Sequence, residues 1–461
     1  MIDTNSILEE SLHDVSFTFS EPDDQPQSIN IDISEGSPLN SQDFTGAHYN
    51  VNSILAAGRL DHLSQISQTL SVDYMIINES KLDENIPTSL LHINGFHDPI
   101  RRDRNRHGGG CMVYISKNLT FKQYDNLQSD HFEHIWVDIR VNNKTYSINA
   151  LYRPPNESAD DHSLFLNESE KILKSMLNHK SDNFILASDM NFGNIYSKVP
   201  SLPAKPLDFS APELFESYSL SQIIDIPTRI TFDTTSLIDL IFCQKTENIQ
   251  CHGTLPKIAD HDGTFVSFHC TLDRPKPKTK TILDFKNVDE VALIKHLKEI
   301  DFNIEVLSKP VFHQAQIMSK ILNCALNKFV PVKTVTVRPN DQPWVNSYTR
   351  LLLRKKNRNY NFFKKLNSRC ISAASDPLIA TDIVTRLKDK CTRALKKSKS
   401  ASQESTEANR RAKQAYFNTV NSTMHNCQIS AKKKVFNFKE THENQQSFRY
   451  SSNNRGRSGS N

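Results

Sequence analysis

The stretch 184–191 constrains the fold more than any other part of the sequence. Residues 184–187 are apolar or small and predict a buried strand, which ends abruptly at a Ser-Asp-Met-Asn tetrapeptide. Asp189 and Asn191 are two residues apart, so in an extended backbone their side chains leave on the same side. A carboxylate beside a carboxamide at a strand end favours a catalytic sheet edge, although Asp-x-Asn alone also forms ordinary turns.

Polar residues stand at the ends of several other apolar runs, which favours the catalytic interpretation. Glu79 follows the run 72–78, and Tyr152 follows the hairpin strands 135–141 and 145–151. An Asp-His pair precedes the strand 265–270, where a carboxylate can orient the histidine and hold it cationic or basic. The recurring positions are Asn50, Glu79, Tyr152, Asp189, Asn191, Asp239, Asp260 and His261.

Two of these residues predict a metal site. Glu79 and Asp260 offer hard oxygen ligands. Mg²⁺ prefers one or two carboxylates together with several waters and a substrate phosphate. We therefore expect Mg²⁺ as the cofactor, with Mn²⁺ as a substitute.

The other residues fit hydrolysis of a phosphodiester. Asp189 and Asn191 can position and deprotonate a water molecule. Asp239 is a charge inside the apolar run 236–242 and needs a partner, which His261 can provide. His261 and Tyr152 can then stabilise phosphate oxygens as negative charge grows in the transition state. The expected activity is a metal-dependent phosphodiesterase.

A loop rich in arginine and glycine offers a candidate contact with the substrate. Residues 101–107 contain four arginines and run directly into three glycines at 108–110. Glycine lets a backbone approach a ligand closely, and guanidinium groups suit phosphates. Arg104 and Arg106 are therefore candidate substrate-binding residues, with a solvated hairpin loop as an equal alternative.

Composition excludes several classes of protein. No apolar run among the 461 residues approaches the roughly 20 needed to span a bilayer, and the first ten residues do not resemble a signal peptide. The eight cysteines include no Cys-x-x-Cys pair, which argues against a zinc ribbon and against a disulfide framework. We expect an intracellular protein of the nucleus, the cytoplasm or both, with no membrane partner.

Charge is distributed unevenly along the chain. Residues 1–58 contain no Lys or Arg, whereas cationic residues cluster between 350 and 434. Such asymmetry indicates a nucleic-acid partner. We expect a DNA substrate and, through the basic C-terminal region, RNA as a further partner.

Eight separated motifs together resemble the endonuclease/exonuclease/phosphatase family. Within it they are most similar to the apurinic-like endonuclease of non-LTR (LINE-type) retrotransposons, a class of transposable element, over about residues 50–271. The motifs are Asn-Val-Asn-Ser from Asn50, Asn-Glu-Ser-Lys-Leu from Asn78, Gly-Gly-Gly from Gly108, Tyr-Arg-Pro-Pro from Tyr152, Ser-Asp-Met-Asn from Ser188, Pro-Thr-Arg from Pro227, Ser-Leu-Ile-Asp from Ser236 and Ala-Asp-His from Ala259.

The resemblance implies a four-layer α/β sandwich, in which two packed β-sheets are flanked by helices and the active site lies at one end. It implies an endonuclease that nicks target DNA for target-primed reverse transcription. Asn50 would lie beside Glu79 at the metal, and Thr228 and Ser236 would contact the substrate region, with Thr231 as an alternative register to Thr228.

The sequence departs from the family pattern at three places. Ser188 and Ala259 replace a usual Gly and Ser, and the apolar strand that normally precedes Asn50 is replaced by the polar residues 41–48. We therefore expect the first strand to be short or frayed.

Five regions are expected along the chain. They are a disordered acidic N-terminus at 1–44, the endonuclease/exonuclease/phosphatase domain at 45–272, a linker at 273–286, a basic helical region at 287–437 and a disordered tail at 438–461. The helical region, with Pro343-Trp344, resembles the connector that precedes reverse transcriptase in such elements. No Tyr-x-Asp-Asp-like box follows, so we expect a truncated product whose reverse transcriptase is supplied elsewhere.

Two rival functions use the same residues. Phosphatases of inositol lipids, sphingomyelinases and deadenylases share the catalytic outline, because one fold supports several substrates. A decayed element product that only binds nucleic acid is the alternative from another class. Metal-dependent nicking of supercoiled plasmid distinguishes the proposed endonuclease from both.

Overall fold

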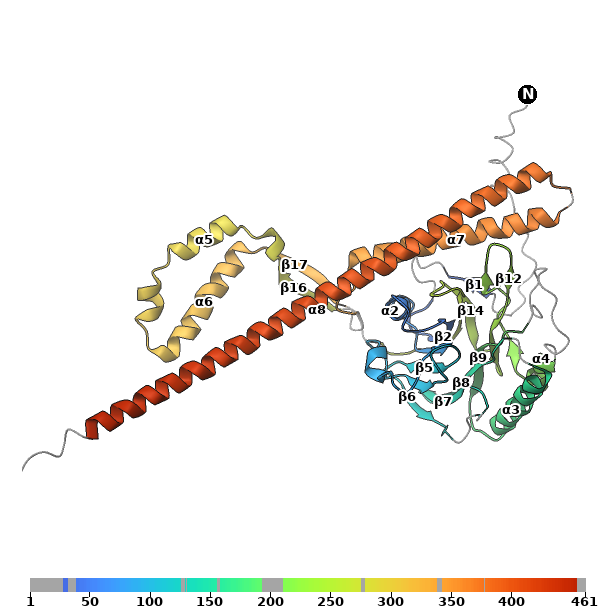
Figure 1. Cartoon of the computed structure of the whole chain (residues 1–461), viewed down its shortest axis with the longest axis horizontal. Coiled ribbons are helices and arrows are strands. Elements are labelled where there is room, and N and C mark those ends of the chain that lie inside the picture. The colour runs from blue at the N-terminus through green and yellow to red at the C-terminus, as the bar shows by residue number, and fades with distance from the viewer. Residues whose placement is uncertain are drawn as a thin grey trace, which may run out of the picture. The chain divides into compact units, whose positions relative to one another are not determined.

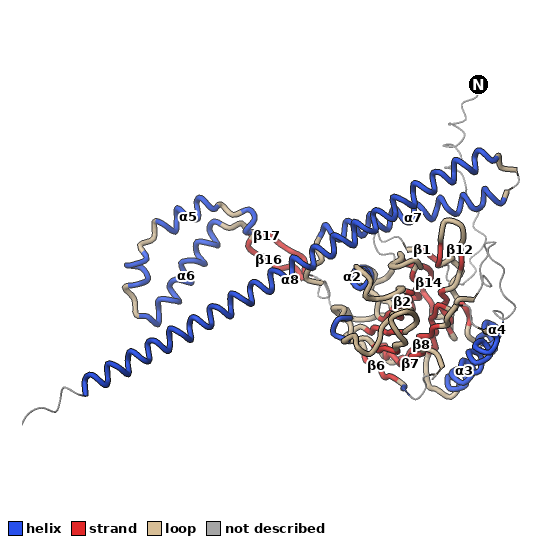
Figure 2. Tube along the Cα trace, viewed as in Figure 1, coloured by secondary structure: helices blue, strands red, loops and turns tan. Residues whose placement is uncertain are grey.

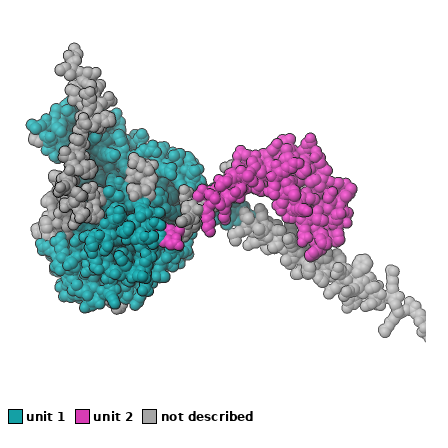
Figure 3. All heavy atoms as spheres, turned by 180° about the vertical axis from the view of Figure 1, so that it is seen from behind, with its two compact units in different colours: residues 1–272, 343–461 teal, residues 273–342 magenta. Residues whose placement is uncertain are grey.

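The structure is a computed structural model that describes residues 28–31, 39–125, 129, 131–155, 158–192, 210–274, 278–337, 342–376 and 378–453. The chain divides into two compact units (Figure 3), which are residues 1–272 with 343–461 and residues 273–342. Within the described residues, no helix combines the length and apolar character that crossing a membrane requires.

Two β-sheets form the first unit. The first has the strand order β1-β14-β15-β2-β3-β5-β4, and the second has the order β10-β13-β9-β8-β7-β6. The strands of the first are β1 (Ser28–Asn30), β2 (Phe44–Asn50), β3 (Tyr74–Asn78), β4 (Ile100–Arg102), β5 (Cys111–Ile115), β14 (Ile249–Leu255) and β15 (Gly263–Phe268). Those of the second are β6 (Thr120–Gln123), β7 (His134–Val141), β8 (Lys144–Tyr152), β9 (Asn183–Asp189), β10 (Ser221–Gln222) and β13 (Asp239–Cys243).

Helices cover the outer faces of the two sheets. Figure 1 shows α2 on one side and the pair α3 and α4 on the other. The bounds are Arg59–Thr69 for α2, Ala159–Leu177 for α3 and Ser210–Ser217 for α4. A short antiparallel hairpin joins β11 (Arg229–Ile230) to β12 (Thr235–Ser236). The expected mixed α/β fold with two packed sheets and flanking helices is thereby confirmed.

Side chains that alternate between the two faces of each strand explain how sheets and helices are layered. In β3, Tyr74 and Ile76 belong to the core cluster that also contains residues of the second sheet. Met75 and Ile77 belong to a separate cluster with Leu63 of α2. Successive side chains of a strand point to opposite faces, so an almost wholly apolar strand is buried on both.

The expectation of a short or frayed first strand was wrong. All seven residues of β2 are buried, because β2 lies between β15 and β3 in the middle of its sheet. Its polar groups find partners there: the hydroxyls of Thr45 and Ser267 lie 2.9 Å apart, and the amide of Thr45 donates to Asp73 at 2.9 Å. Buried polar groups that are hydrogen-bonded do not destabilise a strand.

The ends of the chain differ partly from expectation. Residues 1–27 and 32–38 of the N-terminal segment 1–44 lie outside the described residues, but β1 within it pairs in parallel with β14. The tail expected at 438–461 overlaps helix α8 (Thr381–Asn453), and residues 454–461 lie outside the described residues.

The region after the nuclease-like domain is also divided differently. The expected linker 273–286 contains β16 (Lys278–Leu283), which pairs with β17 (Val332–Val337) in the second unit. This unit also holds α5 (Glu290–Lys298), a π-helix (Asn303–Leu307) and α6 (Val311–Phe329). Helices α7 (Ser347–Ser375) and α8 belong to the first unit instead, so the basic helical region expected at 287–437 is not one body.

Helix α7 packs directly against the sheets' domain, which explains this division. Leu353 joins the core cluster that covers the outer face of the first sheet. Tyr360 and Phe363 form a further cluster, against which Ile230 and Phe232 of the β11–β12 hairpin pack. Figure 2 shows α7 alongside this part of the domain.

Candidate active site

Several strand ends meet at one edge of the two sheets. Asn50 at the end of β2 is paired with Asn78 at the end of the parallel strand β3. In the second sheet, Tyr152 at the end of β8 is paired with Asp189 at the end of β9, and Asp189 is paired with Asp239 at the start of β13. The register therefore brings Tyr152, Asp189 and Asp239 together within the second sheet, and the hydrogen bond from Asn50 to Asp189 joins the first sheet to them.

Tight backbone turns follow these strand ends. Positive φ angles occur at Asn52 (43°), Glu79 (50°), Lys81 (52°) and Asn191 (47°). A side chain other than glycine is uncommon in this region of φ, and such residues cluster at functional sites.

The carboxylates of Glu79 and Asp189 are joined by an amide. Asn50 Nδ2 donates to Glu79 Oε1 at 3.0 Å and to Asp189 Oδ2 at 2.7 Å. Asn50 Oδ1 accepts from the amide of Asn52 at 3.0 Å, which fixes this orientation. Asn50, expected at the metal, thus bridges two carboxylates through its nitrogen.

Tyr152 and Lys81 complete the surroundings of Glu79. The hydroxyl of Tyr152 donates to Glu79 Oε1 at 3.4 Å, and Lys81 Nζ lies 3.2 Å from Oε2. Burial, followed by the charge of Glu79, raises the pKa of Tyr152, so the phenol keeps its proton. It can therefore act as a hydrogen-bond donor to an anionic substrate.

Asp189 is held from three sides. Its backbone amide donates to Asn78 Oδ1 at 2.8 Å, and its Oδ1 accepts from the amide of Asn191 at 3.2 Å. Burial, with the charge of Asp239, raises the pKa of Asp189 to about 7. A carboxylate with a pKa near neutrality is suited to accept a proton.

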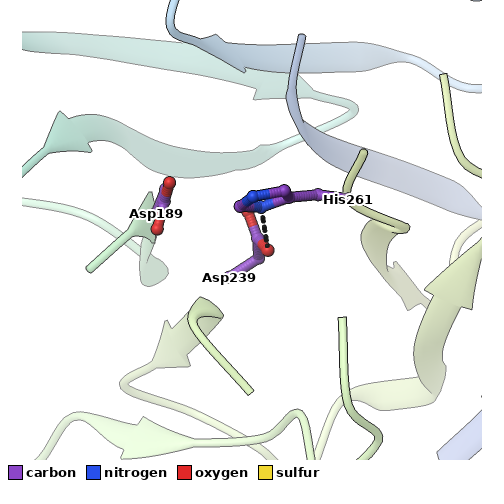
Figure 4. Close-up of side chains that lie close together, drawn as sticks. All are labelled: Asp189, Asp239 and His261. Carbon is purple, nitrogen blue, oxygen red and sulfur yellow. Dashed lines mark hydrogen bonds and ion pairs between the residues drawn. The ribbon is translucent and has the colours of Figure 1, made fainter. Parts of the chain in front are cut away.

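His261 and Asp239 form a buried pair (Figure 4). The Nδ1 of His261 lies 2.8 Å from Asp239 Oδ2. Burial alone would lower the pKa of His261, but the Asp239 carboxylate raises it to about 10. Burial alone would raise the pKa of Asp239, but the charge and hydrogen bond of His261 hold it below its usual range. His261 is therefore cationic near neutral pH, with Nε2 free of the pair.

The β11–β12 hairpin supports this pair. The Thr228 hydroxyl accepts from the Asp239 amide at 3.2 Å, and the Ser236 carbonyl accepts from the Thr228 amide at 3.0 Å. Thr231 instead bonds within the exposed hairpin turn, so of the two threonines the structure brings Thr228 to the site. Asp260 is half exposed, and its Oδ2 lies 3.8 Å from His261 Nε2.

Glu79 is a better candidate ligand for a divalent cation than the compact group formed by Asp189, Asp239 and His261. Asp189, Asp239 and His261 offer ligand atoms within 4.8 Å of one another. That geometry is already explained by the hydrogen bond between His261 and Asp239. The Glu79 side chain is 19% exposed, so waters and a phosphate oxygen could complete the coordination that hard cations prefer. Of these groups, the Glu79 carboxylate is therefore the better donor for such a cation.

The predicted arginines are placed less centrally. Arg104 lies 5.5 Å from the ring centroid of Tyr152 and 3.1 Å from Glu133 Oε1, so its charge is partly neutralised. It lines a cavity of ≈ 700 Å³ with Arg101, Arg102, Pro154 and others. Arg106 is exposed, and its side chain forms no hydrogen bond or ion pair with another described residue.

Three residues of the site were not predicted from the sequence. His48 Nε2 lies 2.6 Å from Asn78 Oδ1, and Asn78 in turn holds Asp189. Lys81 Nζ donates to Asn52 Oδ1 at 2.6 Å and faces Glu79. A signal for Asn78 was available, because it is the polar residue that ends the apolar run 74–77.

Comparison with known proteins agrees with this geometry. Residues 47–261 match the endonuclease/exonuclease/phosphatase family. No curated protein sequence matched the chain.

Similar folds occur among solved structures. One is the endonuclease domain of TRAS1, a telomere-specific non-LTR retrotransposon (15% identity, TM-score 0.39, 50% of this chain and 100% of that one). Another is an AP endonuclease from Leishmania major (12%, 0.43, 53% and 93%). A third is a 3'-5' exonuclease from Neisseria meningitidis (12%, 0.39, 49% and 99%). On its family match, the segment 47–261 of this chain is a domain of the endonuclease/exonuclease/phosphatase family.

Proposed function

We propose that residues 45–272 are a divalent-metal-dependent phosphodiester hydrolase that nicks DNA, with Mg²⁺ as the cation and Mn²⁺ as a substitute. The observation that carries the proposal is the placement of two carboxylates, Glu79 and Asp189, on one amide, close to a cationic histidine. Hydrolysis of a phosphodiester needs a base, a donor to the phosphate and a cation.

Each side chain has a distinct part in this proposal. Asp189, with Asn191 beside it, would orient a water molecule and accept its proton. His261 would donate from Nε2 to a phosphate oxygen, because its Nδ1 is committed to Asp239. Tyr152, at the end of β8, would donate to the phosphate from the second sheet. A cation held by Glu79 and Asp260 would supply charge neutralisation when bound.

A finer proposal concerns the biological reaction. The retroelement-like motifs, among them Tyr-Arg-Pro-Pro from Tyr152, support a single-strand nick that leaves a 3' hydroxyl. A reverse transcriptase supplied elsewhere would extend that hydroxyl in target-primed insertion. Nicks that a DNA polymerase cannot extend would contradict this chemistry.

The primary test is conversion of supercoiled plasmid to the open circle by the purified chain. We expect nicking with Mg²⁺ or Mn²⁺ and none with EDTA, because without a cation the anionic Glu79 and Asp260 add negative charge beside the phosphate and neutralise none of it. Glu79→Gln should behave like the EDTA sample, whereas the exposed Glu84→Gln should nick normally. Equal nicking with and without EDTA would contradict the proposed metal dependence.

A cationic face on α7 supports a nucleic-acid substrate. Residues 347–400 contain 15 Lys or Arg and three Asp. Four exposed cations of α7 lie within one helical sector, opposite the buried face, and form no ion pair with another described residue. We call them the α7 cationic face: Arg354, Arg358, Lys365 and Arg369.

Neutralising the α7 cationic face with glutamine should weaken the salt dependence of duplex DNA binding. Each lost phosphate contact removes roughly 0.9 from the slope of log affinity against log salt, so four contacts remove up to about 3.6. A matched control neutralises four cations that already pair with Asp or Glu: Lys174, Arg386, Arg410 and Arg411. Identical slopes for the two variants would show that this face is only solvated.

A further inference from the structure

Helix α7 contacts the two chain segments that carry His261 and its support. One is the β11–β12 hairpin, which follows Thr228, and the other is the loop 257–263 between β14 and β15. Tyr360 and Phe363 of α7 pack with Ile230 and Phe232 of the hairpin. Asn367 Nδ2 donates to the Thr231 carbonyl at 2.9 Å. The helix thus holds the hairpin by both apolar and polar contacts.

The loop 257–263 is held by a buried ion pair. Lys364 Nζ donates to Asp262 Oδ2 at 2.7 Å, and the two side chains are 9% and 0% exposed. Lys257, in the same loop, lies 3.7 Å from the ring centroid of Tyr360. A buried carboxylate without a partner is costly, so the position of Asp262 depends on Lys364.

Asp262 connects this ion pair to the catalytic pair. It follows His261 directly, and its amide donates to the Thr228 carbonyl at 2.7 Å. The Thr228 hydroxyl in turn accepts from the amide of Asp239, the partner of His261. A displacement of Asp262 would therefore reach both members of the pair, one through the chain and one through Thr228.

We infer that α7 is a part of the active site, in which Lys364 is a positioning residue that fixes His261 and Asp239 through Asp262. The inference deepens the proposed function and rests on it. It also changes the meaning of the basic C-terminal helices: α7 presents cations outward, while its inner face sets the geometry of the histidine. Loss of that geometry should lower catalysis without removing substrate binding.

The test compares three variants of the full chain. Lys364→Met removes the buried ion pair, Lys364→Arg keeps a cation there, and Lys355→Met removes an exposed ion pair of the same helix, the one with Glu404. We expect Lys364→Met to lower kcat for plasmid nicking on the order of 10- to 100-fold, because small misplacements of catalytic groups are that costly. KM should change less than kcat. Lys364→Arg should restore much of the loss, and Lys355→Met should nick at the parental rate.

Lys364→Met leaves Asp262 buried without its partner, so the variant could lose activity because it unfolds. A second variant separates loss of stability from loss of positioning. The double change Lys364→Met with Asp262→Asn removes both charges, so its stability should recover relative to Lys364→Met. Its kcat should stay low, since the link is still broken. Recovery of stability and kcat together would overturn the inference and leave a purely structural ion pair.

Hydrogen exchange separates this inference from the proposed function. Lys364→Met should speed amide exchange in residues 228–239 and 257–263, while β7 and β8 keep their parental rates. That readout needs no enzymatic activity. If the parental chain fails to nick but Lys364→Met speeds local exchange, the proposed function is wrong, whereas the inferred link from Lys364 to His261 is supported. If the parental chain nicks, and Lys364→Met keeps both the parental kcat and the parental exchange rates, the inferred link from Lys364 to His261 is wrong.

Discussion

His261→Ala is expected to lower the rate of plasmid nicking on the order of 100-fold or more, because it removes a preorganised donor to the phosphate. The Asp239 carboxylate raises the pKa of His261 to about 10, so the donor carries a full positive charge near neutral pH. Charge on the phosphate grows most in the transition state, and the loss should therefore appear in kcat. Affinity for DNA should change far less.

His269→Ala is the matched control for this variant. The His269 side chain is 76% exposed and lies outside the site, although it also faces a carboxylate, Asp43, at 3.8 Å. The His269→Ala chain should nick plasmid at the parental rate. The comparison uses single-turnover rates at saturating plasmid, and thermal melting shows whether each variant is folded. A folded His261→Ala chain with the parental rate would remove His261 from the mechanism.

Much of this site was predictable because side-chain alternation and the position of a strand's end are local properties of the sequence. Asp189 and Asn191 were visible at the end of one apolar run, and Glu79 at the end of another. Parallel pairing of β2 with β3 and of β8 with β9 then brings such ends to the same edge. Alternation and strand ends can be read from a sequence, so the residues at the edge followed, whereas the fold class was implied by the family resemblance.

The orientation of side chains within the site could not be read in the same way. Asn50 was expected to face the metal, but its amide nitrogen joins Glu79 and Asp189, and its oxygen is taken by Asn52. Which way an amide points depends on all its neighbours at once, and these come from distant parts of the chain.

The role of α7 was misjudged for a different reason. The cationic residues between 350 and 434 indicated only a basic region that meets nucleic acid. In the structure the side chains of Tyr360 and Phe363 are buried, and Lys364 is paired with Asp262. A helix with one cationic and one apolar face looks the same in sequence whether the apolar face meets a ligand or its own domain.

Because the apolar face of α7 packs on its own domain, truncation before α7 should destabilise the protein. A free basic tail could be deleted without harm to nicking, but removal of residues 343–461 uncovers the surface on which Leu353, Tyr360 and Phe363 are packed. A fully buried large apolar side chain contributes roughly 1.5–3 kcal/mol, and a whole domain has only about 5–15 kcal/mol of net stability. We expect the truncated chain to melt on the order of 10 °C lower or to aggregate, as shown by calorimetry and light scattering.

Point variants on α7 distinguish lost packing from lost charge. Leu353 is 3% exposed and Leu351, two residues earlier, is 54% exposed. Leu353→Ala should cost about 2–5 kcal/mol in urea unfolding, since a cavity forms beside the sheet, whereas Leu351→Ala should stay within about 0.5 kcal/mol of the parent. Neither change alters charge, so the salt dependence of DNA binding should be the same in both. Equal stability of the two variants would mean that α7 does not rest on the domain, and the Lys364 link to His261 would fall with it.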